Sequence, residues 1–151
     1  MSAIKYYNDG SSFRLPNKRI ITEWIRRTAQ AEGYDAGDIN YIFCSSEKLL
    51  EINRQFLGHD YLTDVITFDY SDLKDSKTVS GEIYIDTETV ADNAAQYGIT
   101  PLHEMHRVII HGLLHLCGYK DKTPSAASRM RSKENTCLKT LSKMFVKTSE
   151  R

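Results

Sequence analysis

The sequence predicts an α+β fold in which a small mixed β-sheet packs on helices, with a histidine-bearing helix near the centre. Three observations lead to this prediction. Alternating apolar residues indicate strands, apolar residues at helical spacing indicate helices, and the two kinds of segment are interleaved along 151 residues. This length is that of one ordinary domain. Because we find no repeat, linker or low-complexity segment, we expect residues 1–151 to form a single domain.

The first part of the chain is predicted to contain a strand, a helix, a second strand and a second helix. Residues 3–7 alternate weakly, as in a short edge strand. Residues 17–32 have one apolar face and are followed by Gly33, as expected of an amphipathic helix. Apolar residues then alternate over 39–43. A serine pair opens the next helix, which runs towards Gly58 with three apolar residues, namely Leu49, Ile52 and Phe56.

A hairpin and a third helix follow. Residues 62–70 alternate as a half-buried strand, and after a polar loop residues 79–85 alternate as its antiparallel neighbour. Gly81 indicates either a close approach to the backbone or a sheet bulge. Asp86 or Thr87 can cap the next helix, whose small-residue face contains Val90, Ala91, Ala94 and Ala95.

The stretch 103–121, HEMHRVIIHGLLHLCGYKD, combines most of the histidines with the longest apolar run. Thr100 followed by Pro101 is typical of a helix start, and Gly118 is typical of a helix end. Little polar face remains between them, so this helix is expected in the core. A second Thr–Pro pair at 123–124 starts the last helix, whose buried face is predicted to contain Met130, Cys137, Leu138, Leu141, Met144 and Phe145.

His111 and His115 are four residues apart on the central helix, so both rings project from the same side. In apolar surroundings each imidazole needs a partner. The turn at Gly118 can bring Asp121 back over the pair. Two imidazoles and a carboxylate leave a coordination position open, as in catalytic zinc sites, and also suit iron or another divalent metal. The alternative is a pair of core histidines that bond to backbone carbonyls.

The spacing H-x-x-x-H is also that of zinc proteases, where HExxH places a glutamate beside the first histidine as general base. Gly112 occupies that position here, so a protease of that type would lack its proton acceptor. The other two histidines of this helix, His103 and His106, are expected at surface or capping positions. Cys117 is expected to pack in the core because its helical angle differs from that of the histidine pair.

Composition narrows the choice of partners. The 20 basic residues balance the 20 acidic ones, which argues against a wide, non-specific phosphate-binding surface. Any RNA contact is expected to be local or helped by a partner. No stretch approaches the roughly 20 apolar residues of a membrane span. Three cysteines without C-x-x-C spacing are expected to be reduced core residues of a cytoplasmic protein, namely Cys44, Cys117 and Cys137.

Three segments resemble a known family. HGLLHLCGYKD at 111–121 resembles the HGxLHLxGYDH signature of the YbeY family, INRQFLGHDYLTDVITF at 52–68 resembles its LNxxYRGKDxPTDVLSF segment, and GEIYID at 81–86 resembles its GDIxIS strand. Order and spacing also agree over residues 52–119. The resemblance implies the α+β fold of this family. It also implies a single-strand-specific, metal-dependent endoribonuclease that acts in maturation of the small-subunit rRNA 3′ end and in ribosome quality control.

The resemblance implies a zinc ion bound by His111, His115 and, where the family has its third histidine, Asp121. Asp121 is thus one departure from the family pattern. Leu57 is a second, because the family usually has an arginine implicated in activity at that position. Arg54, one helical turn earlier, is the candidate replacement.

Contacts to substrate are expected from the loop before the third strand. His59 and Asp60 match the KD of the family segment, and Thr63 and Asp64 match its TD. The alternative for these four residues is local turn hydrogen bonding. With Lys120, which can offer charge to a phosphate, His59 and Asp64 complete the list of catalytic candidates. Either water or the RNA 2′-hydroxyl can be the nucleophile.

Two other functions remain open. One is a metal-dependent hydrolase of another substrate such as a peptide, which would need a general base from outside the helix. The other is a non-catalytic ribosome-assembly factor that keeps its metal for stability, which the leucine at position 57 favours. The partners implied are single-stranded RNA, the small-subunit rRNA and ribosome-associated proteins.

Overall fold

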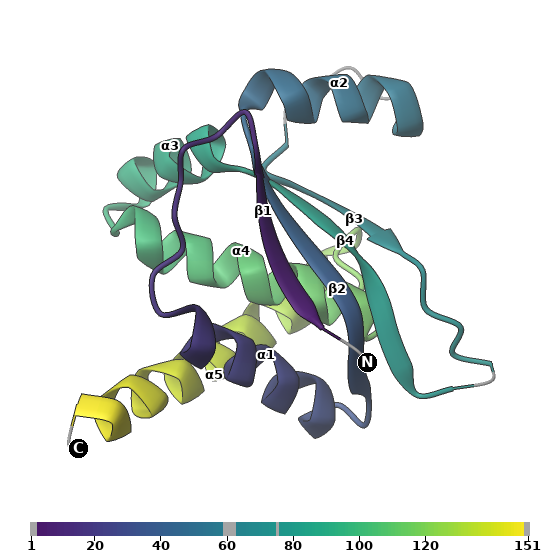
Figure 1. Ribbon diagram of the computed structural model, residues 1–151, viewed down its shortest axis with the longest axis vertical. Coiled ribbons are helices and arrows are strands. Elements are labelled where there is room, and N and C mark those ends of the chain that lie inside the picture. Colours follow the sequence, from purple (N-terminus) through teal and green to yellow (C-terminus); the bar gives the residue numbers. More distant parts are fainter. Residues whose placement is uncertain (1–2, 59–62, 75, 150–151) are drawn as a thin grey trace.

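The computed structural model describes residues 3–58, 63–74 and 76–149, and its strands form one mixed sheet (Figure 1). The strand order is β1-β2-β4-β3. The pairs β1–β2 and β2–β4 are parallel, whereas β3 and β4 form the predicted antiparallel pair. The strands are β1 (Ile4–Asp9), β2 (Asp35–Cys44), β3 (Val65–Asp69) and β4 (Thr78–Asp86). The mixed sheet confirms the α+β prediction.

The helices lie close to their predicted positions, because the predicted cap residues are the ones observed. Ser45 and Thr100 accept hydrogen bonds from the amides of Lys48 and His103, at 3.2 and 3.1 Å. Asp86 caps the third helix. The helices are α1 (Lys18–Ala31), α2 (Ser46–Leu57), α3 (Thr87–Tyr97), α4 (Pro101–Leu116) and α5 (Pro124–Ser149). None of the helices in the described part of the chain is long and apolar enough to cross a membrane.

Alternation along the strands divides the apolar residues between two faces of the sheet. Ile83 and Ile85 of β4 point into the main core, which α1 and α4 cover and α5 closes from outside. Tyr84 points to the other face, where α2 contributes Leu49 and Ile52 to a smaller cluster. Phe56, the third apolar residue of α2, is 63% exposed. Its ring contacts Phe68 at the edge of the smaller cluster.

Helix α4 lies directly against β4 because two glycines allow the approach. A Cβ atom at Gly112 would lie 2.8 Å from Cγ2 of Ile83, and one at Gly81 would lie 2.9 Å from Cδ2 of Leu116. Real Cβ atoms essentially never come this close. Of the two predicted roles of Gly81, the structure shows the close approach, in which Leu116 of α4 lies against the backbone of β4. The glutamate of a protease-type helix has no room at position 112.

His106 is buried, which contradicts its predicted surface or capping position. The side chain lies between Trp24 and Phe145, with ring centroids 6.2 and 6.1 Å away, and the residue is 8% exposed. Its Nε2 has no hydrogen-bond partner among the described residues. Burial lowers the pKa of His106 to about 4. The prediction failed because α1 and α5 cover the side of α4 that faces away from His111, so the helix is buried on both sides.

We expect His106 to lower the free energy of unfolding by about 2 kcal/mol between pH 7 and pH 5. The folded-state pKa of about 4 lies below the ordinary value of 6.5, so the unfolded chain binds the proton first as the pH falls. The stabilisation is present above pH 6.5 and is lost as the pH falls towards 4. Urea unfolding at the two pH values measures it. In His106→Phe this component should vanish, whereas in the control His103→Gln it should remain. An equal pH dependence in all three proteins would contradict the assignment.

Candidate metal centre

The predicted histidine pair and Asp121 lie together at the C-terminal end of α4. The rings of His111 and His115 have centroids 4.6 Å apart. Gly118, with φ of 100°, turns the chain back after the helix, and the amide of Tyr119 donates to the carbonyl of Leu114 at 3.0 Å. This turn places Oδ2 of Asp121 3.3 Å from Nε2 of each histidine.

These three side chains can hold a metal ion. One donor atom from each lies within 4.8 Å of the other two. Both histidines offer the same ring nitrogen, Nε2, towards the carboxylate oxygen. Two imidazoles and one carboxylate match the three-ligand set of catalytic zinc sites, in which a fourth position stays open.

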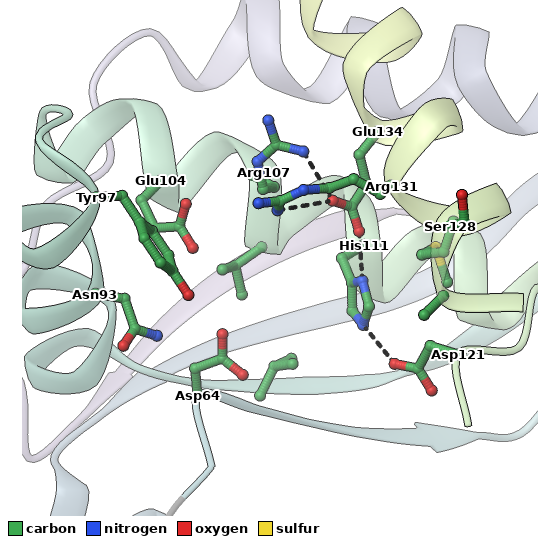
Figure 2. A pocket seen from close by; sticks show the side chains of 14 residues that line it. Asp64, Asn93, Tyr97, Glu104, Arg107, His111, Asp121, Ser128, Arg131 and Glu134 are labelled. Carbon is green, nitrogen blue, oxygen red and sulfur yellow. Dashed lines mark hydrogen bonds and ion pairs between the residues drawn. The ribbon is translucent and has the colours of Figure 1, made fainter. Parts of the chain in front are cut away.

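Glu134 of α5 contacts His111 on the ring nitrogen that faces away from Asp121. Nδ1 of His111 donates to Oε2 of Glu134 at 2.6 Å, and Nη1 of Arg107 donates to Oε1 at 2.9 Å (Figure 2). Glu134 is only 4% exposed. A carboxylate at Nδ1 keeps the proton on that nitrogen, so the lone pair of Nε2 remains free on the side of Asp121.

The pKa shifts of the two histidines differ in direction. Burial alone would lower the pKa of His111, but the hydrogen bond and charge of Glu134 and the charge of Asp121 raise it. Burial alone would raise the pKa of Glu134, but the hydrogen bonds from His111 and Arg107 hold it below its ordinary value. The pKa of His115 is lowered by burial and by the neighbouring His111. The second imidazole is therefore kept neutral, as a ligand must be.

Sequence analysis missed Glu134 and Arg107. A signal for Glu134 was present, because it lies four residues after Met130 and four before Leu138, both predicted on the buried face of α5. A carboxylate on a buried stripe needs a partner. The partner itself was not visible, because α4 and α5 meet only in the folded chain.

A cleft of about 530 Å³ opens beside the candidate metal centre. It runs from His111 and Asp121 to the exposed side of α3 (Figure 2). Asp64, just before β3, points into it from the wall that faces α4. Burial raises the pKa of Asp64. The structure thus brings one of the predicted catalytic candidates into the same cleft as two of the predicted ligands, His111 and Asp121.

The other candidates are not among the described residues that line the cleft. His59 and Asp60 lie outside the described residues. Lys120 is exposed and lines a separate hollow together with Arg129. Leu57, 43% exposed at the end of α2, is absent from the described lining of the cleft, and so is Arg54.

Comparisons with known proteins agree on one family. The model of the family described as endoribonuclease YbeY matches residues 6–142. The endoribonuclease YbeY of Bacteroides thetaiotaomicron is 47% identical over 136 residues, which cover 90% of this chain and 97% of that protein. That of Cytophaga hutchinsonii is 44% identical over 135 residues, covering 89% and 93%.

The fold is also similar to a solved structure. The solution structure of TM1509 from Thermotoga maritima superposes with a TM-score of 0.65 at 27% sequence identity. The match covers 97% of this chain and 93% of that one. The similarity of fold therefore extends over nearly the whole of both chains.

Proposed function

This chain belongs to the endoribonuclease YbeY family, a family of metal-dependent nucleases that act on RNA, and we propose that it cleaves single-stranded RNA beside a metal ion held by His111, His115 and Asp121. The observation that carries the proposal is the convergence of three donor atoms beside a cleft that His111 and Asp121 line. The substrate we propose is the 3′ end of small-subunit rRNA in the cytoplasm, during its maturation and in ribosome quality control.

Zinc is the ion that we propose for this site. Asp121 stands where the family has a histidine, and the resulting two-histidine, one-carboxylate set binds zinc as well as other divalent metals. When bound, the ion would supply a Lewis acid that stabilises negative charge on a phosphate. Glu134 would orient the imidazole of His111 and increase its basicity.

Asp64 is the proton acceptor that we propose. Helix α4 cannot supply one beside His111, since Gly112 packs against Ile83 without room for a side chain. Asp64 faces His111 across the cleft, and a carboxyl whose pKa burial has raised is a better base than an exposed one. It would take the proton of the attacking oxygen, from water or from a 2′-hydroxyl, and return it to the leaving oxygen.

Arg131 is the phosphate contact that we propose in place of the arginine missing at Leu57. Arg131 lines the cleft, and its side chain is 57% exposed, with its guanidinium 3.9 Å from Glu134. Arg107 is less available, because it donates to both Glu134 and Asn135 at 2.9 Å. An accessible guanidinium in the cleft matches the expectation of a local RNA contact in a chain without net charge.

Metal removal tests the proposed function. The protein, purified without chelator, is offered an RNA with the small-subunit rRNA 3′ end as a single strand, as a duplex, and as DNA of the same sequence. We expect cleavage of the single-stranded RNA only. Dialysis against chelator should reduce its rate by at least about a hundredfold, since the Lewis acid is lost, and about one equivalent of zinc should restore it.

Two results would contradict the proposal. Cleavage that persists in the metal-free protein would show that the reaction does not require the metal. Protein that binds one equivalent of metal and cuts no RNA would favour a non-catalytic assembly factor. A peptide panel assayed in parallel tests the alternative hydrolase.

A further inference from the structure

One carboxylate in the cleft has no partner. Glu104, on α4, is 5% exposed and lines the cleft, and its carboxylate makes no hydrogen bond or ion pair with any residue of the described chain. Arg107 is one turn further along the same helix, but its guanidinium points to Glu134 and Asn135 instead. Burial raises the pKa of Glu104, although the nearby charges of Arg107 and Arg131 act to lower it. The carboxylate therefore lies at the cleft with its acceptor capacity open to a ligand that supplies hydrogen-bond donors.

The surroundings of Glu104 are suited to a flat, neutral group. Asn93 and Tyr97 lie one turn apart on α3 and face the same end of the cleft (Figure 2). Tyr97 is 56% exposed. Asn93 and Tyr97 make no side-chain hydrogen bond with another described residue, so an amide and an aromatic face are both available.

Charge argues against a phosphate at this end. Glu104 and Asp64 both face it with carboxylates, which repel phosphate, whereas the candidate ligands His111 and Asp121 lie towards the other end and the guanidinium of Arg131 lies between Glu134 and Glu104. Along α4, Glu104 is seven residues before His111, which corresponds to about 10 Å. The reach from a phosphate to the edge of a neighbouring base is comparable.

We propose that Glu104, Tyr97 and Asn93 form a nucleobase subsite that selects guanine next to the scissile phosphate. This proposal rests on the proposed ribonuclease function and specifies its substrate. Guanine is the standard base that presents two adjacent donors, N1–H and N2–H, on its pairing edge, and a carboxylate accepts two such bonds in parallel. Tyr97 would stack on the base, as aromatic residues do in single-strand binding sites.

The test compares five-nucleotide RNAs with a single guanosine, inosine or adenosine between uridines. Inosine lacks only the N2 amino group of guanosine. Cleavage rates are measured with metal-loaded protein. Binding is measured by fluorescence anisotropy on the same sequences with 2′-O-methyl sugars, which are checked on a gel to remain intact. We expect guanosine to be favoured over inosine and adenosine by about tenfold or more, as for a lost hydrogen bond to a charged group.

Variants separate the contributions of the side chains. In Glu104→Gln the amide offers one acceptor and one donor, which match N6–H and N1 of adenine, so the preference should shift from guanosine to adenosine. Tyr97→Ala should weaken the binding of all three oligonucleotides alike, by about tenfold, because the stacking contact is lost. The exposed controls Glu47→Gln and Tyr7→Ala, outside the cleft, should behave as the unmodified protein.

The outcomes distinguish the two proposals. Cleavage and binding that do not discriminate between bases, with Glu104→Gln unchanged, would overturn the subsite and leave the ribonuclease function standing. Selective binding of guanosine without any cleavage would support the subsite and overturn the function. A protein that shows no binding preference and no cleavage would overturn both proposals.

Discussion

Replacement of His115 by alanine is expected to abolish both metal binding and RNA cleavage. Loss of an outer-shell partner already costs roughly 10- to 100-fold in metal affinity or activity, and loss of a ligand should cost more. Because His115 is partly exposed at the end of α4, the fold should persist without it. Elemental analysis gives the metal content, cleavage of single-stranded RNA gives the activity, and urea unfolding checks the fold.

Matched variants define the ligand set. His103→Ala, on the exposed first turn of the same helix, should retain metal and activity. Asp121→Ala should lose both, and metal retained in that variant would remove Asp121 from the set. Glu134→Gln keeps a hydrogen-bond acceptor near His111 but removes its charge, so it should bind metal roughly 10- to 100-fold more weakly. A wild-type protein that cleaves RNA without metal would contradict the whole assignment.

Asp64→Asn is expected to lower the cleavage rate by roughly 10²- to 10⁴-fold, the usual contribution of a general base, while metal content stays the same. The amide keeps the shape of the side chain but cannot accept the proton. Single-turnover cleavage at saturating RNA measures this effect without a contribution from binding. The contrast with His115→Ala is informative, because only the ligand variant should lose the ion.

Asp92→Asn is the control for Asp64→Asn, because Asp92 is exposed on α3 and is not among the described residues that line the cleft. Its rate should equal that of the unmodified protein. An Asp64→Asn protein that cleaves at full rate would show that another group accepts the proton. An Asp64→Asn protein that also loses metal would show that Asp64 helps to hold the ion instead.

The sequence by itself determined the elements and brought the candidate ligands together at the end of α4. Ser45, Asp86 and Thr100 identified the starts of three helices, and the alternation over 79–85 identified a strand with one face in the core. His111 and His115 share a side of α4 because helical geometry repeats every 3.6 residues. Asp121 follows so closely that one turn at Gly118 brings it to them. All of these relations are local, so the order of residues is enough to predict them.

Only the tertiary structure decided which distant residues complete the site. Glu134 meets His111 across 23 positions of sequence, and Asp64 enters the cleft from just before β3, the edge strand that faces α4. The burial of His106 was likewise decided by tertiary packing. Residues of α1 and α5 cover its side chain, and neither contact can be predicted from the α4 segment alone. Such contacts depend on how helices and strands pack, and packing is decided by the combined burial of many residues rather than by the pattern of one segment.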